Sequence, residues 1–324
     1  IIGEEFQLLE VLGHGAYGCL FLGQSLKDNS YVAVKVLSKL GLDFQQLQLQ
    51  QLEMDIQSSL KHPYLLALHR TIQDKDYIYM VMELCDQGDL FDFVIRDQDI
   101  NPVREQTLVK KLFSQILEGV ENMHANGVYH RDLKLENILL KCEDDENEDD
   151  ITCKVADFGL ATRERYSMEF GCGSTSYLAP EHFNDSIVNN NNPVTTTTTT
   201  ATAATTTELV PYDASASDVW SLGILLLALM FGRNPWQEAS SADPAFAEYK
   251  KCPRMLKNQL FPELSTATYR LLSSVLSING SDRPSVSEFK EQFLAIKQLY
   301  VDESEDAYFS DEPQRVDSPV SIPT

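Results

Sequence analysis

Two short motifs constrain what this chain can fold into more than any other feature. Residues 130–137 read His-Arg-Asp-Leu-Lys-Leu-Glu-Asn, and residues 157–159 read Asp-Phe-Gly. Asp132 is placed to accept a proton from an attacking hydroxyl. Asn137 and Asp157 offer the hard oxygen ligands that Mg²⁺ prefers. Together the motifs predict one reaction centre, built from two loops, in which a metal ion neutralises phosphate charge.

A glycine-rich stretch lies upstream, within residues 6–36, where alternating apolar residues predict short strands. Residues 13–18 read Gly-His-Gly-Ala-Tyr-Gly, and such glycines let a strand-turn-strand backbone approach phosphates closely. Alone, this pattern is more often an ordinary turn. Val-Ala-Val-Lys follows at residues 32–35. A lysine at the end of an apolar strand is usually a surface residue, so its meaning depends on the other motifs.

In this order and at this spacing, the motifs resemble those of the protein kinases. The resemblance implies an enzyme that uses ATP and Mg²⁺. The expected site residues are Asp132, Lys134, Lys35 and Glu53 for catalysis, with Asn137 and Asp157 as metal ligands. Lys35 would grip the α- and β-phosphates and Glu53, rather than the alternative Asp55, would hold it. Lys134 is typical of kinases that phosphorylate Ser or Thr.

The resemblance also implies an ATP site around a hinge. Residues 77–84 predict a buried strand, after which Glu83 and Cys85 would present backbone groups to adenine. Leu20 stands where the family usually has valine, and it keeps an apolar lid for the base. The expected ATP-binding residues are Leu12, Gly13, Gly15, Gly18, Leu20, Ala33, Lys35, Met82, Glu83, Cys85, Asp89 and Leu139.

The implied fold is α+β and bilobal, with a small β-rich N-lobe that has one main helix and a larger, mostly helical C-lobe. We expect the N-lobe at residues 1–84 and the C-lobe at residues 85–300. Low apolar content and biased composition predict disordered segments outside this core. These are an acidic insert at 142–150, expected to extend a surface hairpin, an Asn/Thr-rich insert at 185–210 and an acidic tail at 301–324.

Residues 179–181, Ala-Pro-Glu, match the end of the family's activation segment, expected at residues 157–181. The resemblance implies that Glu181 pairs with the distant Arg283 and that Asp218 holds the backbone of the catalytic loop. It also implies that residues 107–126, which have helical apolar spacing, lead into that loop.

Arg131 usually receives a phosphate group from the activation segment in this family, and the added charge orders the segment. Here Phe170 stands at the position most often phosphorylated. Tyr166 and Ser167 are nearby hydroxyls, and Glu169 could supply a built-in charge. We therefore expect activity that does not require phosphorylation of this segment.

The net charge of −23 is concentrated in two runs, residues 143–150 and 302–317. The remaining body is mildly acidic, and we expect no nucleic-acid partner and no membrane association. The longest apolar run, 224–231, is too short to cross a bilayer and predicts a buried helix. Six scattered cysteines are typical of a reducing cytoplasm or nucleus. Because the chain begins at Ile1, we expect it to be part of a longer protein.

We expect protein substrates with Ser or Thr acceptors and a monomeric catalytic domain. Glu136 implies a mild preference for basic sequences, although Ala228 replaces a second carboxylate that basic-directed relatives carry. Gln57 stands at a position that is normally apolar in the family, and a Gln-rich run, 45–51, precedes it. These two features suggest a likeness to fungal kinases related to the meiosis-inhibiting and glucose-signalling yeast enzymes. Two alternatives to an active protein kinase remain: a catalytically silent pseudokinase scaffold and a small-molecule phosphotransferase.

Overall fold

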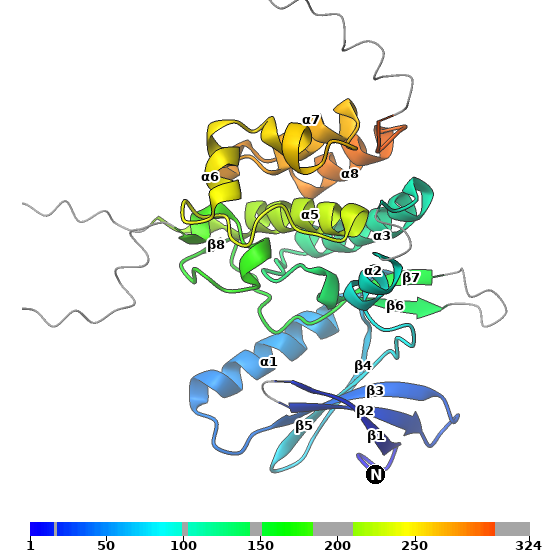
Figure 1. Cartoon of the computed structure of the whole chain (residues 1–324). Coiled ribbons are helices and arrows are strands. Elements are labelled where there is room, and N and C mark those ends of the chain that lie inside the picture. The colour runs from blue at the N-terminus through cyan, green and yellow to red at the C-terminus, as the bar shows by residue number, and fades with distance from the viewer. Residues whose placement is uncertain (16–17, 99–102, 143–150, 184–209, 302–324) are drawn as a thin grey trace, which may run out of the picture.

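The computed structural model describes residues 1–15, 18–98, 103–142, 151–183 and 210–301, which form two lobes (Figure 1). A small lobe holds a five-stranded sheet and one helix, and a larger lobe is mostly helical. This is the expected α+β bilobal arrangement. The predictions of disorder in the two inserts and the tail fall outside the described residues, apart from their boundary positions.

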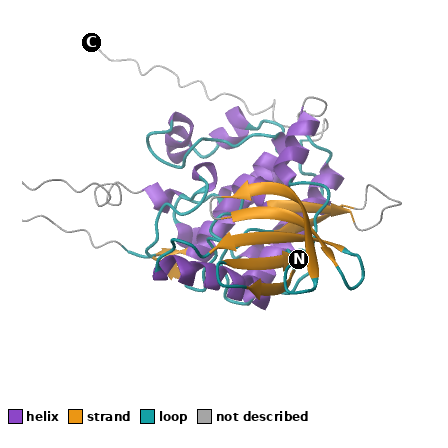
Figure 2. Ribbon diagram, turned by 90° about the horizontal axis from the view of Figure 1, so that it is seen from below, coloured by secondary structure: helices purple, strands orange, loops and turns teal. Residues whose placement is uncertain are grey.

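The sheet of the small lobe is antiparallel throughout, with strand order β1-β2-β3-β5-β4. Strand β3 is central, so Lys35 lies opposite Leu20 of β2 and Met80 of β5. Figure 2 shows the strands of this sheet side by side, with helices behind them. The strands are β1 (Phe6–Gly15), β2 (Gly18–Ser25), β3 (Tyr31–Ser38), β4 (Leu68–Gln73) and β5 (Tyr77–Met82).

Two glycines near the β1–β2 turn differ in what a side chain would meet there. A Cβ atom at Gly18 would lie 2.0 Å from the carbonyl oxygen of Val36, so a side chain there would push β2 away from β3. A Cβ atom at Gly13 would meet nothing within 4 Å. Packing of the sheet therefore explains Gly18, whereas no contact among the described residues requires glycine at position 13.

Helix α1 (Phe44–Ser59) begins at Asp43, whose carboxylate and backbone form a capping box with Gln46. Its buried face presents Met54 to a core cluster that includes Met80 of the sheet. Gln57, although polar, is buried on the same helix. Its amide nitrogen donates to the carbonyl oxygen of Leu66 at 3.2 Å and lies 3.5 Å from the sulfur of Met82. This hydrogen bonding explains how a polar residue is accommodated there.

The larger lobe is built around helix α5 (Ala214–Phe231), which is buried along nearly its whole length. Among the described residues it is the one helix long and apolar enough to cross a membrane by length and composition, but 89% of that stretch is buried inside the fold. It therefore has the character of a core helix. The surrounding helices are α2 (Leu90–Gln98), α3 (Gln106–Ala125), α6 (Pro244–Lys251), α7 (Thr266–Val275) and α8 (Val286–Ala295).

Two small sheets lie beside these helices. Strands β6 (Ile138–Cys142) and β7 (Ile151–Val155) form a hairpin. Strand β8 (Tyr166–Ser167) pairs with β9 (Tyr212–Asp213). The β6–β7 hairpin also joins the lobes, because Val155 exchanges backbone hydrogen bonds with the segment that follows α1: Leu66 N–H donates to its carbonyl oxygen and its own N–H donates to Tyr64, both at 2.9 Å.

The predicted pair of Glu181 and Arg283 is confirmed. Two guanidinium nitrogens of Arg283 lie 2.7 and 2.8 Å from the two carboxylate oxygens of Glu181. The Arg283 side chain is completely buried, and it also donates to the carbonyl oxygen of Ala216 and lies 5.0 Å from the ring of Trp220. This bidentate pair fastens the end of the activation segment to α5.

Removing one partner of this pair should destabilise the larger lobe strongly. Glu181→Gln would leave the buried Arg283 charge without its carboxylate, and we expect the free energy of unfolding to fall by about 3–5 kcal/mol. Urea unfolding of the purified chain measures the change. Lys251→Met, which breaks the exposed pair with Glu248, is the control and should cost less than about 0.5 kcal/mol. Equal losses in the two variants would contradict the structural role.

Candidate active site

Asp132 lies at the centre of a network formed by its own loop and the activation segment. One carboxylate oxygen accepts the backbone N–H of Ser174 at 2.8 Å, and the other lies 3.0 Å from the ammonium of Lys134 and 3.1 Å from the amide nitrogen of Asn137. Lys134 also donates to the hydroxyl of Ser174 at 2.7 Å. The network fixes the orientation of the Asp132 carboxylate, which a general base requires.

The backbone of this loop is held by Asp218 from α5, as expected. Its carboxylate is completely buried and accepts the backbone N–H groups of His130 and Arg131, each at 2.8 Å. Burial alone would raise the pKa of Asp218, but hydrogen bonding and charge from His124 and the loop lower it below the ordinary value. Arg131 has a backbone φ of 67°, a conformation that costs energy for a non-glycine residue and persists only where its surroundings fix it.

Lys35 is joined to helix α1 through Glu53. The two side chains meet at 2.6 Å, and Asp157 lies 3.9 Å from the same ammonium. Asp55 faces outward and accepts a hydrogen bond from Gln51 instead. The lysine therefore stands between a carboxylate of the small lobe and one of the larger lobe, where phosphate oxygens can reach it.

Asn137 and Asp157 fit a magnesium site in their chemistry. Both hydrogen bonds of the Asn137 side chain to Asp132 use the amide nitrogen, so the amide oxygen is the atom suited to bind a cation. Asp157 has a φ of 61° and a half-exposed carboxylate. No cluster of three or more His, Cys, Asp or Glu side chains forms a metal site within the described ranges. Mg²⁺ commonly completes its shell with substrate phosphates and water.

The expected adenine-binding residues gather where the lobes meet. Leu20, Cys85 and Leu139 are partly buried against one cluster that includes Met82, and Ala33 is buried on β3. The backbone N–H of Glu83 donates to the carbonyl oxygen of Ala67. Of the two backbone groups of Glu83, the carbonyl is therefore the one suited to contact adenine.

Three residues of the predicted ATP site, Leu12, Glu83 and Asp89, have features that the sequence did not show. Leu12 on β1 has 46% of its surface exposed. The Glu83 side chain contacts two lysines rather than lying free. One carboxylate oxygen of Asp89 accepts the N–H of Asp92 at 2.8 Å and thereby caps α2, which leaves the other oxygen for a ribose hydroxyl.

Comparison with known proteins agrees with this geometry. A family model described as "Protein kinase domain" matches residues 6–294. The chain belongs to the protein kinase family. It is 34% identical over 92% of its length to the fission-yeast "Negative regulator of sexual conjugation and meiosis", which confirms the expected likeness to the meiosis-inhibiting enzyme. It is 33% identical over 94% to the fission-yeast "Serine/threonine-protein kinase ksp1".

A plant relative gives the same assignment. The chain is 30% identical, over 94% of its length, to "CBL-interacting serine/threonine-protein kinase 18" of Arabidopsis thaliana. It spans 62%, 59% and 52% of these three relatives. The chain is thus a serine/threonine protein kinase domain, and a domain of this family uses ATP and acts on proteins.

The activation segment of this kinase is held at both ends. Arg131 lies 2.6 Å from the carboxylate of Glu169 and donates to the carbonyl oxygen of Leu160 at 2.6 Å. Burial alone would lower the pKa of Arg131, but Glu169 and Tyr212 raise it. Gly173 has a φ of 113°, and a Cβ atom there would lie 2.5 Å from the carbonyl oxygen of Arg131. Only glycine fits this crossing of the two loops.

An aromatic cluster supports the same segment. The Phe170 ring lies 5.3 Å from Tyr212 and 6.3 Å from His182, with ring centroids as the reference points. Nδ1 of His182 accepts the N–H of Gly171 at 3.1 Å, so its Nε2 is the donor to the Ser217 hydroxyl at 2.9 Å. Phe170, which stands where the resemblance implies the usual phosphorylation site, is therefore packed into the fold.

Three contributors to the kinase site were not found from the sequence. Ser174 contacts both Asp132 and Lys134, His124 lies 2.8 Å from Asp218, and Tyr212 packs on the activation segment. Ser174 directly follows Gly173, and this position was the one available signal. The roles of His124 and Tyr212 arise from packing between distant segments, which no local pattern shows.

The buried imidazole of His182 should make stability depend on pH. Burial lowers its pKa from 6.5 to about 4, so between these values the unfolded chain binds a proton that the folded chain does not. The free energy of unfolding should fall as the pH drops through this window. His182→Gln keeps a donor and an acceptor without the titration. Between about pH 7 and about pH 4, wild type should lose roughly 3 kcal/mol more than the variant in urea unfolding; parallel profiles would contradict this.

Proposed function

We propose that this domain is a catalytically competent kinase that transfers the γ-phosphoryl group of ATP to Ser and Thr hydroxyls of proteins, rather than a silent scaffold. One observation carries the proposal. Lys35 is held by Glu53 at 2.6 Å and lies 3.9 Å from Asp157, and Asn137 connects Asp132 to Ala156, the residue before Asp157. A scaffold has no need for this arrangement of charges, and each of these groups has a defined part in phosphoryl transfer.

In the proposed reaction, the residues act mainly by positioning and charge. Asp132 accepts the proton of the substrate hydroxyl and aims its oxygen at phosphorus. Lys35 holds the α- and β-phosphates, and Lys134, 3.0 Å from Asp132, offsets charge on the transferring group. Such preorganised charges act without reorganisation at the moment of transfer. Mg²⁺ held by Asn137 and Asp157 would supply charge neutralisation on the phosphates.

We further propose that the activation segment needs no phosphate. The Glu169 carboxylate occupies the place opposite Arg131 where the family uses a phosphate group, and Phe170 packs against Tyr212 beside it. A native carboxylate gives less charge than a phosphate, and the aromatic cluster adds apolar packing to it. Together these contacts support an active arrangement in the unmodified chain.

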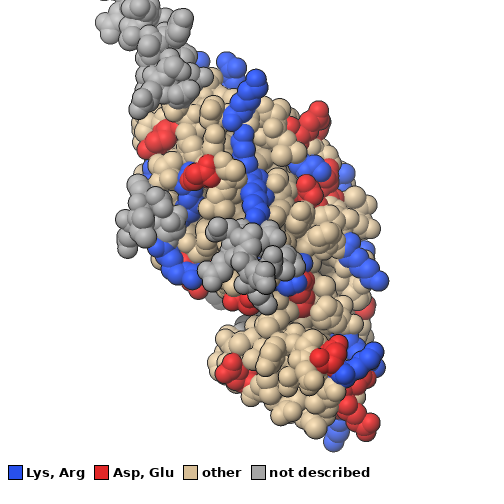
Figure 3. Space-filling model, turned by 90° about the vertical axis from the view of Figure 1, so that its right-hand side faces the viewer, with Lys and Arg blue, Asp and Glu red and all other residues tan. Residues whose placement is uncertain are grey.

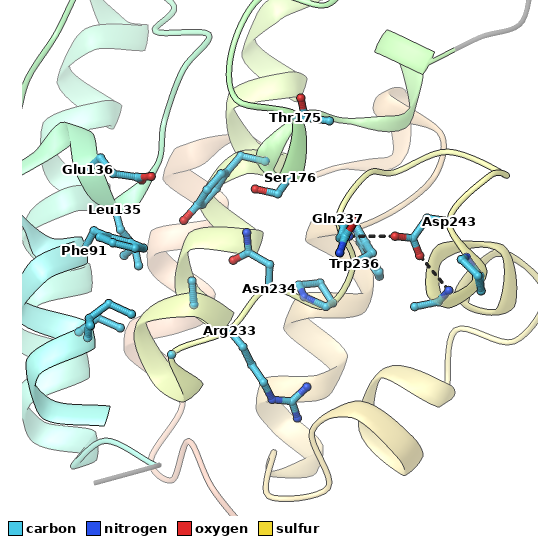
Figure 4. A pocket seen from close by; sticks show the side chains of 18 residues that line it. Phe91, Leu135, Glu136, Thr175, Ser176, Arg233, Asn234, Trp236, Gln237 and Asp243 are labelled. Carbon is cyan, nitrogen blue, oxygen red and sulfur yellow. Dashed lines mark hydrogen bonds between the residues drawn. The ribbon is translucent and has the colours of Figure 1, made fainter. Parts of the chain in front are cut away.

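The protein substrate is proposed to lie along a cavity of about 920 Å³ next to the catalytic loop (Figure 4). Phe91 and Leu135 line one side near Glu136, and Ser176 and Asn234 lie across from them. Arg233 also lines this cavity, and its guanidinium donates to the carbonyl oxygen of Leu260 and stacks 4.3 Å over the Phe261 ring.

Glu136 is the acidic side chain that this cavity offers to a substrate. It is exposed, whereas Asp243 caps α6 and also binds the N–H of Gln237. Ala228 forms an uncharged part of the wall. One basic residue near the acceptor is therefore the preference that this cavity supports.

The cellular setting is also a proposal. All six cysteines are free thiols, which suits the cytoplasm or nucleus of a fungal cell.

On the face shown in Figure 3, basic side chains form a row across the larger lobe and acidic side chains lie near them. We propose that the catalytic domain acts as a monomer on its protein substrates.

Transfer of ³²P from Mg·ATP to a Ser/Thr peptide library tests the activity. We expect transfer by the wild type, with enrichment of peptides that carry one basic residue near the acceptor. Asp132→Asn should lower kcat by roughly 10²–10⁴-fold, because it removes the general base. Glu136→Gln should remove the basic enrichment and retain transfer.

Asp28→Asn, in an exposed turn of the small lobe, is the control for Asp132→Asn and should leave kcat unchanged. If the wild type binds ATP and transfers no phosphate to any peptide, the scaffold alternative holds. If Asp132→Asn remains as active as Asp28→Asn, the role assigned to Asp132 is wrong.

Phosphatase treatment and a single substitution test the proposed phosphate independence. Treated wild type should keep its kcat. Glu169→Gln should lower kcat by roughly fivefold, since a partly exposed ion pair contributes on the order of 1 kcal/mol. Glu164→Gln removes an exposed carboxylate from the same segment and is the matched control. Collapse of activity after phosphatase treatment would refute the idea.

A further inference from the structure

The side chain of the hinge residue Glu83 is held by two lysines. One carboxylate oxygen lies 3.0 Å from the ammonium of Lys141 and 2.9 Å from that of Lys154. The exposed fractions of these side chains are 12% for Glu83, 28% for Lys141 and 8% for Lys154. Charges so deeply buried are costly unless they are paired, so this ion cluster is a definite feature of the fold.

The cluster joins the small lobe to the β6–β7 hairpin. Glu83 directly follows β5, whereas Lys141 belongs to β6 and Lys154 to β7. In the hairpin, Lys154 lies opposite Leu139. Because residues opposite each other or two apart share a face of a sheet, Leu139, Lys141 and Lys154 lie on one face. Leu139, one of the expected ATP-binding residues, and the two lysines therefore belong to a single surface.

Backbone hydrogen bonds reinforce this junction. The N–H of Gln87 donates to the carbonyl oxygen of Leu140 at 3.1 Å, and the N–H of Leu140 donates to Gly88 at 2.8 Å. The N–H of Cys142 donates to the Asp86 carboxylate at 3.2 Å. The hinge chain thus runs beside β6, where Asp89 and Leu139 form an isolated antiparallel bridge, and the Glu83 cluster lies at its beginning.

The same hairpin carries the metal ligands. Asn137 directly precedes β6, and Asp157 follows the end of β7 by two residues. Adenine is expected at the hinge, and the phosphates at Asn137 and Asp157. The β6–β7 hairpin is therefore the part of the structure that spans from the one subsite to the other.

We propose that Glu83, Lys141 and Lys154 are positioning residues that fix the adenine-binding hinge relative to the metal-binding ends of the β6–β7 hairpin. This inference rests on the proposed function, because it assigns ATP to that site. Burial raises the pKa of Glu83, but the two lysines outweigh it and lower the pKa below its ordinary value, so the carboxylate remains charged.

The physical consequence is that binding of the adenine base of ATP and binding of its phosphates become coupled. When two subsites are held at a fixed separation, binding of the base also places the phosphates, and the second contact costs little further ordering. If the separation fluctuates, each subsite can still bind its own part of ATP, but the advantage of joining them falls. Loss of the cluster should therefore weaken Mg·ATP more than it weakens adenosine, which has no phosphates.

Calorimetric titration with Mg·ATP and with adenosine tests this coupling. Lys154→Met removes one charge of the cluster and the double variant Glu83→Gln/Lys154→Met removes two, and both keep side-chain volume close to the original. We expect the Kd of Mg·ATP to rise about tenfold and the Kd of adenosine to rise less than about threefold. KM for ATP should rise in parallel, while KM for the peptide stays unchanged. Lys154→Arg keeps the charge and should restore most of the affinity.

Controls make each result decisive. Lys251→Met breaks an exposed pair and should change neither Kd. If Lys154→Met does not fold, Lys141→Met, at the more exposed member of the cluster, takes its place.

Equally weakened binding of Mg·ATP and adenosine would mean that the cluster only shapes the hinge, and unchanged Kd values would mean a purely structural role. Either result overturns the proposal. The titrations need no phosphoryl transfer, so a wild type that binds ATP without transferring phosphate refutes the proposed function alone.

Discussion

The buried carboxylate of Asp218 is the interaction on which the catalytic geometry depends. It lies in α5, the helix at the centre of the larger lobe, and it accepts hydrogen bonds from the backbone of His130 and Arg131. A fully buried carboxylate must satisfy its oxygens within the protein. The catalytic loop and His124 provide those donors, so the loop conformation and the packing of α5 stabilise each other.

Further charged pairs join segments that are distant in the sequence. Lys35 with Glu53 connects β3 to α1, and Arg131 with Glu169 connects the catalytic loop to the activation segment. The bidentate contact between Arg283 and Glu181 fastens the end of that segment. In each pair, at least one of the two side chains is partly or fully buried. Removing one partner of such a pair lowers the free energy of unfolding more than removing one partner of a surface pair. These ion pairs thus connect the segments that form the site.

The residues of the motifs could be predicted because the chemistry of phosphoryl transfer restricts their types. A base, two oxygen ligands and a lysine near phosphates leave few alternatives, and the order of Asp132, Asn137 and Asp157 in the sequence made the pattern specific. The structure changed the reasons behind some of these residues. Gly18 is required by its approach to Val36, and Gln57 is kept in the core by its hydrogen bond to Leu66.

By itself, the sequence determined the family and the bilobal α+β fold and predicted the catalytic and metal-binding residues, because local pattern and spacing carry that information. Only the tertiary structure decided the charge contacts that lie outside the family motifs. Glu83 appeared in the sequence as a backbone contact for adenine, and its side chain turned out to join two lysines of the β6–β7 hairpin. Such contacts arise when packing brings strands together and buried charges must find partners, and no periodicity along the chain encodes them.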